Sequence, residues 1–250
     1  MRDSVELTLA RLAFRQLAGS RRSLWVLALA LLPVLLSLLF SGNPGPNDDV
    51  TEDYGELYQA LIVGVLLPIV SLVVGTSVFG AEVDDGTITY VLGKPVPRWR
   101  IVLTRVVVAG LATAMVVAPS AYISGVIALR SQPSAPRVAL GMAGAVIAGS
   151  FLYCALFVAI SLSTRRALVA GLAYVVVWES SLSNTFGGTR ALSVRQYTQT
   201  FAQSWAGLEA SVLNARLELG TALTMAAVVA VLATIHSIRR LQRFEIGEAV

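Results

Sequence analysis

Charge is scarce in this sequence, and its scarcity excludes an ordinary soluble domain. Charged residues make up 14% of the 250 residues and hydrophobic residues 56%, whereas soluble domains have about 25% and about 45–50%. A soluble domain of this length needs far more charge to cover its surface. Together with a mean hydropathy of +0.72, this composition indicates a helical protein that crosses a membrane several times.

Metal-binding side chains and disulfide partners are also scarce. Cys154 is the only cysteine and His236 the only histidine, which excludes an internal disulfide, a cysteine zinc site and a cluster of histidine ligands. No serine–histidine–aspartate arrangement and no pair of carboxylates lies within a long apolar run. We therefore expect that this chain is not an enzyme and binds no cofactor of its own.

Long apolar runs predict six membrane-spanning helices, because each crossing of a hydrocarbon core of about 30 Å needs about 20 apolar residues. The runs are Leu24–Phe40, Leu57–Phe79, Ile101–Leu129, Val138–Ser163, Ala167–Trp178 and Leu219–Ile238. The fifth is the shortest, since Glu179 interrupts it. A cleaved signal peptide at 24–40 is disfavoured, because the run is too long and no small-residue cleavage site follows it. We expect one all-α membrane domain over residues 1–250.

Basic residues predict the orientation of the chain. Fourteen of the 19 lysines and arginines fall in the segments on the same side as the N-terminus, and such residues concentrate in cytoplasmic loops. The loop after the first span carries acidic residues and no base. We therefore expect a multi-pass protein of the cytoplasmic (inner) membrane, with both termini in the cytoplasm. Topology alone explains the basic pI, so no nucleic-acid partner is expected.

Two segments outside the spans are amphipathic. Residues 1–22 place arginines on a narrow stripe, which is typical of an interfacial helix on the inner membrane surface or of a plain basic flank. Apolar residues at helical spacing in residues 180–218 predict an outer helix that is interfacial or re-entrant, for substrate handling or for anchoring. Its predicted face comprises Val194, Tyr197, Phe201, Trp205, Leu208 and Val212.

Glu179 is the one acidic residue at depth in a predicted span. A charge within a span costs at least about 2.5–3.5 kcal/mol and often marks a functional site. Two interpretations of Glu179 remain open. Its carboxylate either faces a substrate path or forms local hydrogen bonds near the outer interface.

Small residues recur at four-residue steps in two of the predicted spans, as Gly110/Ala114/Ala118 and Gly141/Ala145/Gly149. Such steps allow helices to approach closely in a membrane. We expect them to serve packing within one subunit rather than contact between subunits.

Residues 80–100, between the second and third spans, combine an acidic patch, a Gly-Thr pair, a short apolar run and a basic, proline-rich end. This composition predicts a structured cytoplasmic element, with an ordinary loop as the alternative. The order Glu82-x-x-x-Gly86-Thr87, then an apolar run, then Pro95-Val96-x-Arg98 and a long span, resembles the corresponding loop of type-2 ABC permeases. These permeases are the membrane subunits of ATP-binding cassette exporters.

The six-span layout extends this resemblance over nearly the whole chain. In the family, this loop forms a coupling helix that docks on the ATPase subunit. The resemblance implies that the docking residues here would be Glu82, Asp85, Gly86, Thr87, Pro95 and Arg98. It also implies a dimer with a second permease copy and two separate ATPase subunits, which would bind the ATP and magnesium.

The chain itself has no phosphate-binding loop, although glycines flank part of this segment. Six residues separate Gly86 from Gly93, and Pro95 follows Lys94, whereas that loop has four residues between its glycines and a serine or threonine after the lysine. The alternative function is an ion-coupled transporter or channel without an ATPase. The near absence of charge within the spans argues against proton coupling, but sodium sites built from carbonyls and hydroxyls would leave no sequence signal.

Overall fold

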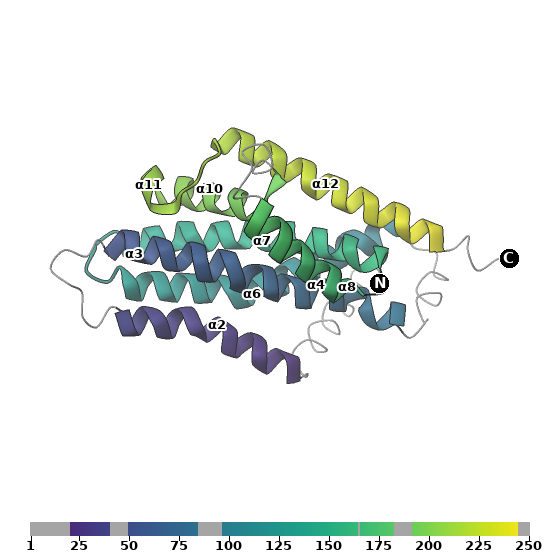
Figure 1. Cartoon of the computed structure of the whole chain (residues 1–250), viewed down its shortest axis with the longest axis horizontal. Helices are drawn as coiled ribbons and strands as arrows, with labels where there is room; N and C mark the ends of the chain where they lie inside the picture. The colour runs from purple at the N-terminus through teal and green to yellow at the C-terminus, as the bar shows by residue number, and fades with distance from the viewer. Residues whose placement is uncertain (1–20, 41–49, 85–96, 165, 183–191, 245–250) are drawn as a thin grey trace, which may run out of the picture.

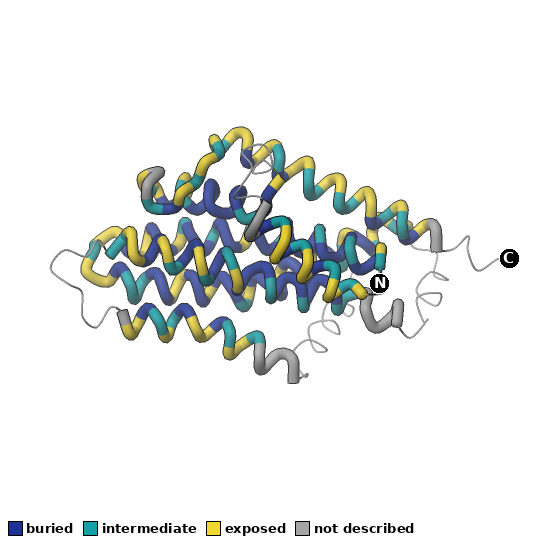
Figure 2. The backbone as a smooth tube through the Cα atoms, viewed as in Figure 1, coloured by how far each residue is buried: buried dark blue, intermediate teal, exposed yellow. Residues whose placement is uncertain are grey.

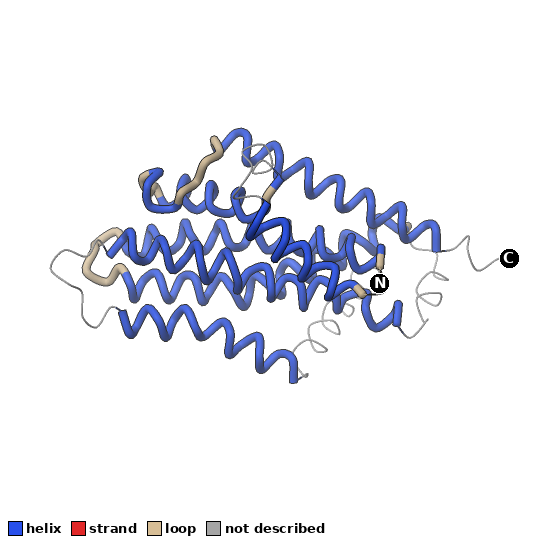
Figure 3. The backbone as a smooth tube through the Cα atoms, viewed as in Figure 1, coloured by secondary structure: helices blue, strands red, loops and turns tan. Residues whose placement is uncertain are grey.

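The computed structural model describes residues 21–40, 50–84, 97–164, 166–182 and 192–244. All regular elements within these residues are helices, joined by short loops (Figure 3). This part of the chain confirms the predicted all-α class. The elements are α2 (Arg21–Phe40), α3 (Val50–Leu57), η1 (Tyr58–Leu66), α4 (Leu67–Asp84), α6 (Arg98–Ala128), α7 (Ala135–Ser163), α8 (Ala167–Ala173), η2 (Tyr174–Leu182), α10 (Val194–Ala206), α11 (Ala210–Leu213) and α12 (Leu219–Phe244).

The helices run back and forth as an elongated bundle (Figure 1). Helices α3, η1 and α4 follow one another without a break as one long rod, in which η1 is a π-helical segment. Helix α8 continues in the same way into the π-helical segment η2. We call the end of the bundle that holds α10 and the turn between α6 and α7 the α10 end. The opposite end, where α6 begins and α12 finishes, is the Arg98 end.

Four helices are long and apolar enough to cross a membrane by length and composition. They are Val50–Val78, Arg98–Ala128, Ala135–Ser163 and Leu219–Gln242. These helices coincide with the second, third, fourth and sixth predicted spans. The first and fifth predicted spans correspond to shorter apolar helices within the described residues, Val26–Leu39 and Ala167–Glu179. The structure thus supports a multi-pass protein, and six crossings remain a prediction.

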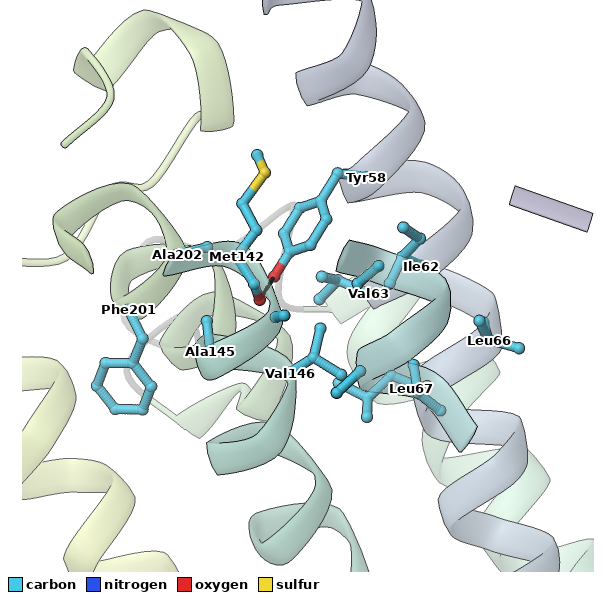
Figure 4. Close-up of a cluster of buried hydrophobic side chains, with 14 of the residues drawn as sticks. Tyr58, Ile62, Val63, Leu66, Leu67, Met142, Ala145, Val146, Phe201 and Ala202 are labelled. Carbon is cyan, nitrogen blue, oxygen red and sulfur yellow. Dashed lines mark hydrogen bonds between the residues drawn. The ribbon is translucent and has the colours of Figure 1, made fainter. Parts of the chain in front are cut away.

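Helix α7 lies at the centre of the bundle and packs against α4, α6, α10 and α12. In the apolar stretch of α7 that is long enough to cross a membrane, 72% is buried inside the bundle, whereas the corresponding share for α12 is 17%. Helix α12 therefore lies on the outside of the bundle (Figure 2). Figure 4 shows Tyr58 and Val63 of η1 beside Met142 and Val146 of α7. The Tyr58 hydroxyl donates to the Met142 carbonyl at 2.9 Å, so this buried ring keeps its polar group paired.

Other buried hydroxyl groups join neighbouring helices. The Tyr54 hydroxyl donates to the Ala121 carbonyl of α6 at 2.8 Å, and the Ser120 hydroxyl donates to the Ala30 carbonyl of α2 at 2.5 Å. A polar group without a partner is costly in apolar surroundings. These bonds therefore favour one register of α2 and of the α3–α4 rod against α6.

Glycines allow α7 to approach two of its neighbours closely. A Cβ atom at Gly141 would lie 2.5 Å from the backbone nitrogen of Ala206 in α10, and one at Gly149 would lie 2.6 Å from Oγ1 of Thr198. On α6, a Cβ atom at Gly110 would lie 2.5 Å from the Phe151 ring. These three glycines confirm that the small-residue steps serve packing within one subunit.

We predict that Gly141→Ala lowers the thermal unfolding temperature of the purified protein. The new methyl group meets the α10 backbone, which cannot move aside as a flexible side chain can, and overpacking of this kind costs about 1–3 kcal/mol. The matched control is Gly220→Ala in α12, where an added Cβ meets nothing within 4 Å. Alanine there should be neutral or stabilising. Equal losses in both variants would contradict the close contact.

Candidate functional site around helix α10

Helix α10 packs against α7, α12, α11 and η1, at the end of the bundle named after it (Figure 1). It begins after Ser193, whose hydroxyl accepts a hydrogen bond from the Gln196 N–H at 3.3 Å. It ends at Gly207, where φ is 67°, a left-handed conformation that suits glycine after a helix. Serine before a helix and glycine after it are both favoured by local physics, so the sequence around α10 sets its limits.

Glu179 of η2 anchors the first turn of α10. Its carboxylate accepts hydrogen bonds from the Ser193 hydroxyl at 2.5 Å and from the Tyr174 hydroxyl at 3.0 Å. The backbone N–H groups of Val194 and Arg195 also donate to it, at 3.0 and 3.4 Å. The first N–H groups of a helix have no acceptor within the helix and carry partial positive charge. A carboxylate is therefore well suited to this position.

The Glu179 carboxylate therefore forms local hydrogen bonds, which is one of the two interpretations that the sequence left open. The side chain is 2% exposed, and its surrounding donors offset the cost of removing a charge from water. No group of three potential metal-ligating side chains occurs among the described residues. A contact between Glu179 and a substrate remains a prediction.

A second set of polar contacts ties α10 to η1 and α11. The Arg195 guanidinium donates to the backbone carbonyl of Gln59 at 3.1 Å. The Gln59 side chain donates to the Val212 carbonyl at 2.9 Å and accepts from the Gln199 amide nitrogen at 3.4 Å. Gln59 is therefore the residue at which η1, α10 and α11 meet.

The apolar face of α10 is turned into the bundle to a greater extent than its sequence predicts. Val194, Tyr197 and Phe201 are buried, and only Trp205 of the α10 aromatic residues is exposed, at 45%. The Trp205 ring stacks on Phe201 with centroids 5.4 Å apart. Burial of this face follows from the glycines of α7, which leave room for α10 beside them.

The prediction that Leu208 belongs to the same helical face is wrong. Helix α10 ends at Ala206, and the left-handed Gly207 redirects the chain before Leu208. Val212 lies in the separate short helix α11. The spacing of apolar residues continues past the end of the helix, so periodicity alone overstated its length; Gly207 was the signal that marks the end.

Sequence reasoning did not identify Gln59, Tyr174 or Arg195 as partners of this site. Gln59 and Arg195 meet through the packing of η1 against α10, whereas Tyr174 reaches Glu179 within η2, at a five-residue spacing that fits the π-helical turn there. Ser193 could have been recognised, because serine just before a run of apolar residues at helical spacing is a signal for a helix start. No comparable signal pairs Glu179 with that start.

Most of the predicted ATPase-coupling residues lie outside the described residues. This applies to Asp85, Gly86, Thr87 and Pro95, as it does to residues 1–20 of the predicted interfacial helix. Glu82 lies in the last turn of α4, and Arg98 is the first residue of α6. The two flanks of the segment therefore both lie at the Arg98 end of the bundle.

Basic side chains gather at this same end. Arg100 lies over the ring of Trp99, 5.2 Å from its centroid. Arg105 donates to the Val78 carbonyl of α4, and Arg240 of α12 donates to the Leu162 carbonyl of α7 at 3.2 Å. Arg240 thus bonds to a carbonyl in the last turn of α7, where cations are favoured by the helix dipole, and Arg105 joins α6 to α4.

Comparison with known proteins identifies the kind of membrane protein to which this bundle belongs. A family model described as ABC-2 family transporter protein matches residues 10–183, which is more than half of the chain. The chain belongs to the ABC-2 transporter family. This ABC-2 permease carries several apolar helices that suit a multi-pass membrane protein. The match ends before α10 but includes Gln59, Tyr174 and Glu179, so it covers the partners of α10 and not the helix itself. No curated protein matches the chain.

We predict that Glu179→Ala destabilises this ABC-2 permease strongly. The substitution leaves two hydroxyl groups and two backbone N–H groups without their acceptor, and a buried donor without a partner costs about 1–3 kcal/mol. Glu179→Gln retains one acceptor oxygen and should cause a smaller loss. Thermal unfolding of the purified full-length variants measures both effects.

The control for this experiment is Glu209→Ala. Glu209 is exposed and precedes α11 without forming a side-chain cap, so its loss should change the unfolding temperature little. An unfolding temperature for Glu179→Ala that equals that of Glu209→Ala would show that the carboxylate does not anchor α10.

Proposed function

We propose that this ABC-2 permease is the membrane-spanning subunit of an ABC exporter, moving a substrate across the cytoplasmic membrane with ATP hydrolysed on a separate subunit. The match to the ABC-2 transporter family over residues 10–183 carries this proposal. That family typically pairs with ABC ATPases. The segment Gly86 to Pro95 departs from a phosphate-binding loop, which agrees with ATP and magnesium being bound by the partner.

The proposed assembly is a dimer of two permease subunits with two ATPase subunits. ATP binding would draw the ATPases together, and the segment between Glu82 and Arg98 would transmit that motion to the helices. A pathway between the permease subunits would then change from inward to outward access. In this assembly, the outer segment that includes α10 would contact the substrate.

Charge at the two ends of the bundle supports the proposed orientation. The Arg98 end carries Arg98, Arg100, Arg105, Arg166, Arg239 and Arg240 beside Glu82 and Asp84, whereas the α10 end carries Glu52, Asp53, Glu56, Glu209 and Glu218 beside Arg130, Arg137, Arg195 and Arg216. Basic residues favour the cytoplasmic side. We place the Arg98 end, both termini and the docking segment in the cytoplasm, and α10 near the outer surface, with six crossings in all.

An ion-coupled transporter or channel is the second candidate function. It would need no ATPase, and buried hydroxyl and carbonyl groups such as those near Tyr54 would be the kind of ligand that a sodium site uses. The family match favours the ABC exporter.

Purification from the native membrane distinguishes the two functions. We expect the tagged chain to co-purify with an ATPase that carries a phosphate-binding loop, and the complex in lipid nanodiscs to hydrolyse ATP. Magnesium chelation should abolish that hydrolysis. Recovery of the chain without an ATPase, together with ion flux in vesicles that lack ATP, would refute the exporter proposal and support the alternative.

Substitutions in the docking segment test the proposed route of coupling. Glu82→Ala, and separately replacement of the Gly86-Thr87 pair, should reduce the amount of ATPase recovered per permease. The reduction should be about tenfold for each 1.4 kcal/mol of binding free energy lost between permease and ATPase. The amount of permease in the membrane should stay constant. Glu218→Ala at the α10 end is the control, and unchanged ATPase recovery in the Glu82 variant would remove the docking role.

A further inference from the structure

Three glutamine side chains form a polar stripe along α10. Gln196, Gln199 and Gln203 are separated by steps of three and four residues, so they lie on one face of the helix. Through Gln59, this face meets η1 and α11, because the Gln199 amide contacts Gln59 and Gln59 in turn contacts the Val212 carbonyl. We call this glutamine face of α10, together with Gln59, the glutamine seam.

The side-chain oxygens of the three glutamines are buried and have no hydrogen-bond partner among the described residues. Gln196 is 7% exposed and Gln199 is 3% exposed. A buried acceptor without a partner destabilises the folded state. Folded proteins rarely leave such groups unpaired, and ordered water is a frequent partner. Three such acceptors on one stripe therefore indicate that something occupies the seam.

The orientation of the Gln59 and Gln199 amide groups follows from their neighbours. The Gln59 nitrogen must face the Val212 carbonyl, which can only accept, so the Gln59 oxygen faces Gln199. The Gln199 nitrogen then donates to that oxygen, and its own oxygen is left over. The unpaired atom of Gln199 is thus an acceptor, and its partner must be a hydrogen-bond donor.

Charge selects among the donors. The Arg195 guanidinium already lies at the seam, bonded to the Gln59 carbonyl, and would repel a second cation. We propose that the glutamine seam is a binding site for small neutral hydrogen-bond donors, namely the hydroxyl groups of water or of a polar solute. The occupant bridges the amide oxygens of α10 and strengthens the attachment of this helix to η1 and α11. This site goes beyond the transport proposal and does not depend on an ATPase partner.

The sign of a stability change tests the proposal. In an empty seam, Gln196→Leu or Gln203→Leu would remove an unpaired acceptor and add apolar burial, which would raise the unfolding temperature. In an occupied seam, the same substitutions remove an acceptor that the occupant uses, and the unfolding temperature should fall by about 2–4 °C for each kcal/mol lost.

The measurement is thermal unfolding of the full-length protein in phosphatidylcholine nanodiscs without added solutes. Gln242→Leu is the matched control, because Gln242 is exposed on α12. The proposal is supported if the unfolding temperature falls in Gln196→Leu and in Gln203→Leu. If the double variant loses less than the sum of the two single losses, both residues share one occupant. A rise or no change in both variants overturns the proposal.

A second measurement detects the occupant directly and distinguishes its source. Hydroxyl-radical labelling by X-rays in ¹⁸O-water should label the peptide that contains Gln196 to Gln203 despite its burial, and absence of label would overturn the proposal. Adding sorbitol identifies the source. A larger gain in unfolding temperature for the wild type than for the Gln196→Leu/Gln203→Leu double variant indicates solute hydroxyl groups, and equal gains indicate water.

Discussion

A helix that begins inside an apolar bundle must find acceptors for its first N–H groups within the protein, because lipid provides none. Helix α10 meets this requirement with the Glu179 carboxylate, which accepts from Ser193 and from two backbone N–H groups. The same bonds satisfy the charge of a residue that is 2% exposed. Neither the buried carboxylate nor the buried helix start is favourable alone, so the fold around α10 depends on their being together.

The second requirement is space, and the glycines of α7 provide it. Gly141 and Gly149 lie where any larger residue would contact α10. With its apolar side against α7, α10 turns Gln199 towards Gln59 of η1, which in turn bonds to α11. The amphipathic pattern of α10 matches its two neighbours, with the apolar face against α7 and the polar face along the seam. A helix that lies on the membrane surface would have a similar pattern of residues but a different partner on each face.

The two ends of the bundle differ in chemistry. At the Arg98 end, Arg105 and Arg240 bond to carbonyls of α4 and α7, whereas the α10 end holds buried amides, one buried carboxylate and Arg195, which bonds to the Gln59 carbonyl. Membership of the ABC-2 transporter family gives this asymmetry a functional setting. The helix α10 and its seam lie at the end of the bundle far from the flanks of the segment that resembles a docking loop.

The sequence by itself determined the helical class and the positions of the long apolar helices, because apolar runs act locally. Ser193 and Gly207 are local signals for the limits of α10, but the predicted helical face ran past Gly207 to Val212. It also indicated the close approach of helices at Gly141 and Gly149. The resemblance of the Glu82–Arg98 segment led to the correct family. Only the tertiary structure decided that Glu179 anchors α10, that Gln59 joins three helices and that Leu208 lies off the helical face. Those outcomes depend on which distant side chains meet, and helical periodicity describes the faces of a helix but not the partners that cover them.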